Sequence, residues 1–146
     1  MDRILVIGYG NTLRRDDGAG PEVARRIEAL ALPGVDTLEA HQLLPEHAEL
    51  LSRVDRAIFI DASVGDCPEE IRMEPVAPDP DAGFDAHASD PGGMLALAQI
   101  LFERAPKAWI IPLPAADLDI GEGLSATAED AVEQAVKLIT GFCKQQ

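Results

Sequence analysis

The sequence lacks most of the features that mark exported, membrane-bound or disulfide-bonded proteins. No run approaches the ~18 apolar residues that a membrane-spanning helix needs, and no charged and apolar leader precedes the first strand-like segment. The chain has only two cysteines, Cys67 and Cys143, which form neither a metal-ligand spacing nor a disulfide framework. We therefore expect a cytoplasmic protein without a membrane segment.

Basic residues are also scarce. The chain has 12 Lys and Arg against 26 Asp and Glu, a net charge of −14. Proteins that bind nucleic acids neutralise phosphates with clustered Lys and Arg, so this balance argues against a nucleic-acid partner. It permits a cationic partner or a metal ion, and it also suits an acidic surface that keeps the protein soluble.

What is present indicates one globular domain over residues 1–146. The length falls in the usual single-domain range, 47% of the residues are hydrophobic, and no internal repeat or linker interrupts the chain. We expect a monomer.

Short apolar runs alternate with segments of helical periodicity, which is typical of βαβ units. The predicted fold is an α/β three-layer sandwich: a mainly parallel, five-stranded sheet with helices on both faces. The expected strands are Ile4–Ile7, Val35–Ala40, Arg56–Ile60, 69–76 and Ala108–Leu113. Helices are expected from Pro21, over Pro45–Arg53, from Asp90-Pro91 and from Ser125 or Thr127.

Prolines and periodicity add finer expectations. Pro75 suggests that its strand lies at a sheet edge, and Pro112 argues against a long central pairing of its strand. Leu30 and Leu101 continue the apolar periodicity of their helices, so both are expected to be buried.

Three loops are rich in side chains that bind ligands: Gly8–Gly20, Asp61–Ser63 and Asp85–Asp90. In open parallel sheets, ligands bind beside the loops that leave the carboxyl ends of strands. Gly8-x-Gly10 suggests a dinucleotide site, but Leu13 stands at the third glycine position, and the two following aspartates would repel a pyrophosphate. The other interpretation is a cation site, for which carboxylates and a histidine suit nickel, zinc, manganese or iron.

The first loop carries the ungapped motif Gly8-x-Gly10-Asn11-x-Leu13-x-x-Asp16-Asp17-Gly18-x-Gly20. Further on, Phe59-Ile60-Asp61-Ala62 stands at a strand end, and His87 lies ahead of the helix that contains Met94-Leu95-Ala96-Leu97. In these motifs the sequence resembles the maturation endopeptidases of nickel-iron hydrogenases.

This resemblance implies an endopeptidase that removes the C-terminal extension of the hydrogenase large-subunit precursor after nickel insertion. The implied metal ligands are Asp17, Asp61 and His87, and the nickel that they contact would be supplied by the substrate. Asp16 and Asp17 are the implied catalytic carboxylates; one of them can instead cap the helix or fix the loop. Either metal-activated water or a carboxylate general base, for which Asp16 is the candidate, would serve the reaction.

Two rival functions remain open: a nickel-binding chaperone without catalytic activity and a nucleotide-binding α/β module. Catalysis by Cys67 is not supported, because no base motif accompanies it.

Overall fold

The computed structural model describes residues 2–63, 70–82 and 90–145. Within these ranges, the five strands form one sheet in the order β2-β1-β3-β5-β4. Four strands run parallel, and β4 pairs antiparallel with β5. The strands are β1 (Ile4–Tyr9), β2 (Val35–Ala40), β3 (Arg56–Ser63), β4 (Glu74–Val76) and β5 (Lys107–Pro114).

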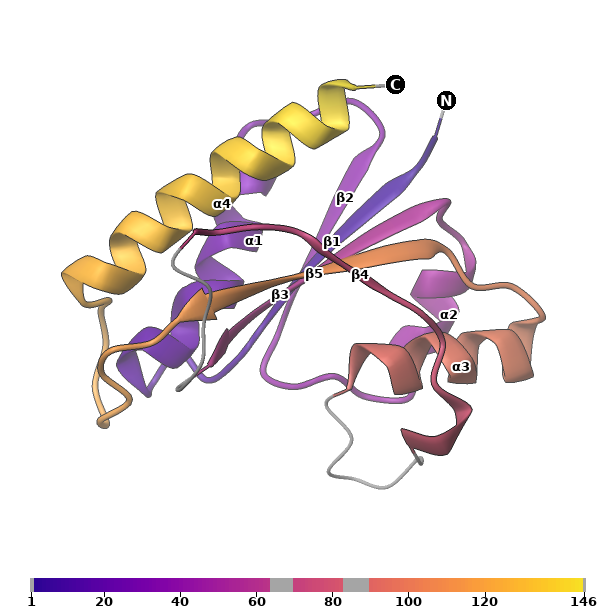
Figure 1. The fold of residues 1–146 in the computed structure, drawn as a ribbon, viewed down its shortest axis with the longest axis horizontal. Coiled ribbons are helices and arrows are strands. Elements are labelled where there is room, and N and C mark those ends of the chain that lie inside the picture. Colours follow the sequence, from indigo (N-terminus) through magenta and orange to yellow (C-terminus); the bar gives the residue numbers. More distant parts are fainter. Residues whose placement is uncertain (1, 64–69, 83–89, 146) are drawn as a thin grey trace.

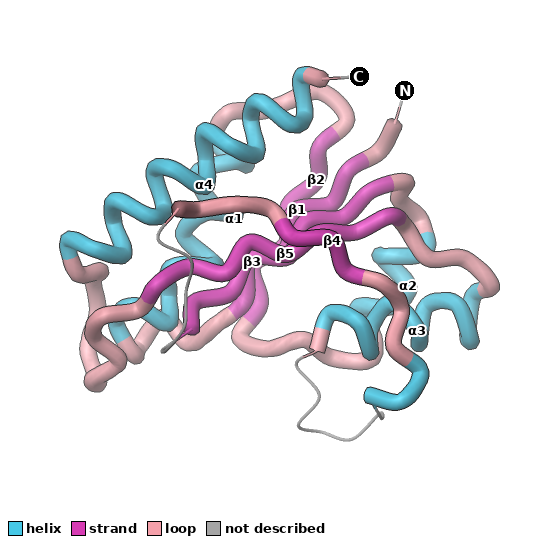
Figure 2. Tube along the Cα trace, in the orientation of Figure 1, coloured by secondary structure: helices cyan, strands magenta, loops and turns pink. Residues whose placement is uncertain are grey.

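Helices cover both faces of this sheet, which confirms the predicted three-layer α/β architecture (Figure 1). Figure 2 shows the same layers coloured by secondary structure, with the strands between the two groups of helices. One face carries α1 (Ala19–Ala29) and α4 (Ala126–Lys144), and the other carries α2 (His47–Ser52) and α3 (Pro91–Phe102). The short 3-10 helices η1 (Arg15–Gly18) and η2 (Pro80–Ala82) complete the described elements.

The side chains of the central strands alternate between two apolar cores. In β3, Ile58 and Ile60 contact the α1 and α4 layer, whereas Ala57 and Phe59 contact the α2 and α3 layer. Strands that are buried on both faces read as continuous apolar runs, and this is why their positions were predictable from sequence. No helix in the described ranges is both long and apolar enough to cross a membrane.

The prediction for Pro75 is confirmed, and the prediction for Pro112 is wrong. Pro75 lies in the edge strand β4. Strand β5 pairs with β3 along its whole length, and Pro112 lies opposite Asp61. Proline is tolerated there because β4 pairs only with 108–110, so the other side of β5 has no described partner strand at Pro112.

Two leucines expected in the core are exposed. Leu30 is 50% exposed because α1 ends at Ala29, and Leu101 is 58% exposed near the C-terminal end of α3. Periodicity alone does not show which turns of a helix the rest of the fold covers.

Candidate active site

The candidate site lies where β1 and β3 end at the carboxyl edge of the sheet. Gly10 directly follows β1, has a φ of +150°, and donates its N–H to Ala40 O at 3.0 Å. A Cβ atom at Gly10 would lie 2.0 Å from the carbonyl oxygen of Asp17. Because only glycine permits this approach, the chain folds back and brings Asp17 to the end of β1.

A second close approach fixes the start of α1. A Cβ atom at Gly8 would lie 1.9 Å from the carbonyl oxygen of Gly20, and one at Gly20 would lie 2.6 Å from that of Ile60. The backbone of β1, the start of α1 and the end of β3 therefore meet without intervening side chains. The helix begins at Ala19, two residues before the predicted start at Pro21.

The Asp17 carboxylate is half-buried at this junction. Its Oδ2 accepts the Asn11 N–H at 2.8 Å, and the Asn11 Oδ1 in turn accepts the Leu13 N–H at 2.9 Å. The loop amide of Asn11, which a bound phosphate would need, is thus already satisfied by a carboxylate. This contact argues against the nucleotide-binding interpretation.

Asp61 lies on β3, two residues after Phe59. Its side chain contacts that of Tyr9. The Tyr9 hydroxyl is hydrogen-bonded to the Asp61 carboxylate, and the Tyr9 side chain is buried in the α2 and α3 layer. Burial first, and then the negative charge of Asp17, raise the pKa of Asp61 to about 6, against the opposing hydrogen bonds from Tyr9 and Ala62. The two predicted carboxylates therefore lie close enough for the charge of Asp17 to act on Asp61.

Burial, followed by the charge of Asp61, also raises the pKa of Tyr9 well above its ordinary value. The phenol consequently remains a hydrogen-bond donor throughout the physiological pH range. Asp90, the N-cap of α3, contributes to the same shift, so its charge acts on this end of the sheet.

Asp16 occupies a different environment from its neighbour. Its side chain is fully buried, and its carboxylate accepts four hydrogen bonds. These come from the N–H groups of Ala116, Asp117 and Ser125 and from the Ser125 hydroxyl, at 2.7 to 2.9 Å. Burial opposes the charged form, but the hydrogen bonds prevail and lower the pKa of Asp16.

These contacts favour the loop-fixing role among those considered for Asp16. Both of its carboxylate oxygens accept hydrogen bonds from a segment about a hundred residues away in the sequence. The same segment also pairs with the first loop through Arg14 and Gly121, where Gly121 N–H donates to Leu13 O at 2.8 Å. The first loop and the loop 115–125 are thus joined beside Asp17.

The structure describes part of the predicted ligand set. Asp17 and Asp61 come together, whereas His87 and Cys67 lie outside the described residues. In 2–63, 70–82 and 90–145, no group of three His, Cys, Asp or Glu side chains is arranged to hold a metal ion. The complete triad therefore stays a prediction.

Two residues of the site were missed by sequence reasoning. Tyr9 continues the alternation of Leu5 and Ile7, so its position two residues past the predicted strand was a usable signal. Ser125 was expected only as a helix start; it does cap α4, with its Oγ accepting the Ala128 N–H, while it also donates to Asp16. No local pattern indicates this second contact.

The sequence matches no model of a protein family and no curated protein. Solved structures do match over nearly the whole chain. The [NiFe] hydrogenase maturation protease HybD from Thermococcus kodakarensis is 27% identical, with a TM-score of 0.72 over 97% of this chain and 99% of that chain. The hydrogenase maturating endopeptidase HybD from E. coli is 22% identical, with a TM-score of 0.75 over 98% and 93%.

A hydrogenase 2 maturation peptidase from a Thaumarchaeota archaeon is 24% identical, with a TM-score of 0.72 and coverage of 99% of both chains. Because nearly all of both chains is matched, neither chain has a large insertion or a missing element relative to the other. The match therefore concerns the whole architecture.

Proposed function

We propose that this chain, which has the fold of the hydrogenase maturation proteases along nearly its entire length, is itself an endopeptidase of hydrogenase maturation. Its substrate would be the precursor of the large subunit of a [NiFe] hydrogenase, from which it removes the C-terminal extension once nickel is inserted. We expect it to act as a cytoplasmic monomer.

The observation that carries the proposal is the pairing of Asp17 and Asp61 at the carboxyl edge of the sheet. Burial and mutual repulsion make two ionised carboxylates costly here, as the raised pKa of Asp61 reports. A divalent cation would offset that repulsion, and oxygen donors combined with an imidazole suit nickel. Perturbed carboxylates of this kind concentrate at functional sites.

His87 completes the proposed ligand set. It precedes Asp90 by three residues in the sequence, a span of at most ~11 Å of extended chain. The charge of Asp90 contributes to the raised pKa of Tyr9, and the Tyr9 hydroxyl is hydrogen-bonded to the Asp61 carboxylate. The imidazole would thus have a short path to the two carboxylates, and three protein ligands would leave coordination positions for the substrate.

The nickel belongs to the substrate in this proposal and would supply Lewis acidity at the scissile carbonyl. The residues of this chain would orient the nickel and carry out the proton transfer. Asp17 is half-buried, and one of its oxygens accepts the Asn11 N–H. As a general base, Asp17 is therefore favoured over Asp16, whose oxygens are all engaged; Asp16 would position the loop that carries Asp17.

The test is cleavage of purified precursor, offered with and without nickel at equal concentration, with release of the C-terminal peptide followed by mass spectrometry. We expect cleavage of the nickel-loaded form only, and its loss in Asp17→Asn, Asp61→Asn and His87→Ala. Asp36→Asn is the matched control, because Asp36 is an exposed residue near the start of the edge strand β2, where it pairs with Arg3, away from the carboxyl edge of the sheet.

Other outcomes separate the alternatives. Equal cleavage of both precursor forms would show that nickel is not the signal and leave a plain peptidase. Stable binding of the nickel-loaded precursor without cleavage would identify a nickel-binding chaperone instead.

A further inference from the structure

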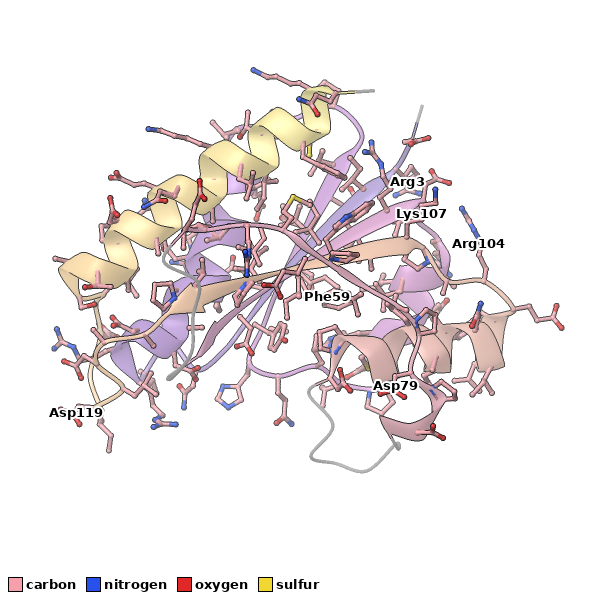
Figure 3. All side chains as sticks on the ribbon, in the orientation of Figure 1. Arg3, Phe59, Asp79, Arg104, Lys107 and Asp119 are labelled. Carbon is pink, nitrogen blue, oxygen red and sulfur yellow. The ribbon has the colours of Figure 1, made fainter. Side chains whose placement is uncertain are left out.

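A cavity of about 560 Å³ lies at the amino ends of β3 and β5, at the opposite end of the sheet from Asp17 and Asp61. Its lining includes three basic side chains, those of Arg56, Arg104 and Lys107. Figure 3 shows Arg104 and Lys107 at the same end of the molecule as Arg3, far from Asp119. In a chain with a net charge of −14, this grouping of cations requires an explanation.

Arg56 is the most buried of these cations. Its side chain is 14% exposed, and its guanidinium lies 4.7 Å from the centre of the Phe142 ring. The Nε approaches Asp2 at 3.4 Å, yet neither Nε nor Nη2 has a hydrogen-bond acceptor among the described residues. Leaving buried charged N–H groups without acceptors is costly, so a ligand oxygen here would be bound favourably.

Lys107 lies beside Arg56. The two are direct partners in the register of β3 and β5, and in a parallel pair such partners project to the same face of the sheet. Lys107 is exposed and takes part in no ion pair with a described residue. Its ammonium group is therefore available to the same ligand as Arg56.

The acidic residues of the lining do not neutralise this pair. Asp55 accepts the Arg3 N–H and the Arg104 Nη2 at 2.8 Å each, so its carboxylate is already engaged. Among the described residues, Asp2 forms an ion pair with Arg56 and with no other cation. Three cations against the two carboxylates of the lining leave one positive charge in surplus, carried by Arg56 and Lys107.

We propose that this cavity binds a small molecule or terminal group through an oxyanion, either a phosphate or a carboxylate. The planar Arg56 guanidinium, whose Nε and Nη2 lack acceptors among the described residues, would attract the oxygens, and Lys107 supplies a second positive charge. The cavity volume falls within the range of small-molecule sites. The ligand would occupy the end of the sheet that the proposed peptidase reaction does not use.

The experiment titrates inorganic phosphate, and separately acetate, into the full chain by isothermal calorimetry, at an ionic strength held constant with sodium chloride. We expect saturable binding of at least one anion, and a loss of about tenfold in affinity in Lys107→Ala. Lys137→Ala is the control, because Lys137 is an exposed lysine of α4 that does not line the cavity. It should bind like the parent.

Arg56→Gln should weaken binding further, with circular dichroism used to verify its fold. If Arg56→Gln does not fold, Lys107→Ala still decides the question. Tighter binding of phosphate than of acetate would identify a phosphate-bearing ligand, and equal or tighter binding of acetate a carboxylate; both support the site. Absence of binding by either anion, or equal affinities of the parent and Lys107→Ala, would overturn it.

Discussion

Two adjacent aspartates in this chain have opposite physical roles, although their side chains are chemically identical. Asp16 is fully buried and accepts four hydrogen bonds, whereas Asp17 is half-buried and accepts one from Asn11. Asp61 carries the strongest electrostatic penalty of the candidate site. At the scale of single residues, these differences lead to two predictions about stability.

Replacement of Asp61 by Asn is expected to stabilise the protein near pH 8 while it abolishes processing. Folding raises the pKa of Asp61 from 3.8 to about 6, so the folded state disfavours the ionised form. The parent therefore loses stability as pH rises through this interval, by on the order of 1–3 kcal/mol, and the Asn variant does not. Urea unfolding at about pH 5 and about pH 8 measures the difference.

The gap between variant and parent should widen as pH rises between these conditions. A variant that is less stable than the parent at the higher pH would contradict the assignment of Asp61 as a strained carboxylate. Asp36→Asn, at an exposed position of the edge strand β2, gives the baseline for loss of a surface charge.

Asp16→Asn is expected to destabilise the protein by roughly 2–4 kcal/mol, because an amide NH₂ would face N–H donors that now meet a carboxylate oxygen. Asp17→Asn serves as the matched control and should cost under ~1 kcal/mol, since it disturbs one hydrogen bond. Denaturant midpoints of the two variants provide the comparison.

The pH dependence of Asp16 has the opposite sign to that of Asp61. Its folded-state pKa is lowered, so its contribution is complete above the ordinary aspartate pKa and is lost as pH falls through the folded value. A similar loss of stability in Asp16→Asn and Asp17→Asn would show that Asp16 does not fix the loop 115–125.

At the scale of elements, the contact between β1 and the start of α1 depends on the absence of side chains. Gly8→Ala should destabilise the protein by about 3 kcal/mol or more, because its Cβ would lie 1.9 Å from the Gly20 carbonyl oxygen and the helix must move. Displacing the helix also displaces Asp17, so processing should be lost with stability.

Gly141→Ala is the control for this prediction. Gly141 lies inside α4 with no heavy atom within 4 Å of the Cβ position, so alanine should stabilise the helix by about 0.5–1 kcal/mol. Thermal unfolding of the two variants should therefore shift in opposite directions. Equal melting temperatures for Gly8→Ala and the parent would show that the helix does not depend on this contact.

At the scale of the whole molecule, net charge is the dominant electrostatic feature. A chain with 26 acidic and 12 basic residues repels itself in the compact state. Half of the ion pairs among the described residues join two exposed side chains, where each pair contributes little. Salt screens the repulsion more than it weakens these pairs. We expect the melting temperature to rise by roughly 3 °C or more between low and moderate salt.

The measurement is a thermal scan in increasing sodium chloride, with a neutral osmolyte at matched osmolality as the control. A melting temperature that falls with salt would show that the ion pairs outweigh the excess of negative charge.

The sequence by itself determined the layers of this protein and the positions of its strands, except that β4 begins at Glu74 and not near residue 69. Burial on both sides of a parallel sheet requires continuous apolar runs, and such runs are visible without coordinates in β1, β3 and β5. The sequence also indicated that Asp17 and Asp61 follow or end such strands, because the carboxyl ends of parallel strands share one edge. Local capping likewise predicted Ser125 and Asp90 at helix starts.

Only the tertiary structure decided what each polar group does at that edge. The separate roles of Asp16 and Asp17 depend on the loop 115–125, whose amides reach Asp16 from about a hundred residues away. The tolerance of Pro112 depends on where β4 stops, and the exposure of Leu101 depends on which turns of α3 the rest of the fold covers. These are properties of contacts between distant segments, and neither periodicity nor propensity within a segment contains information about its distant neighbours.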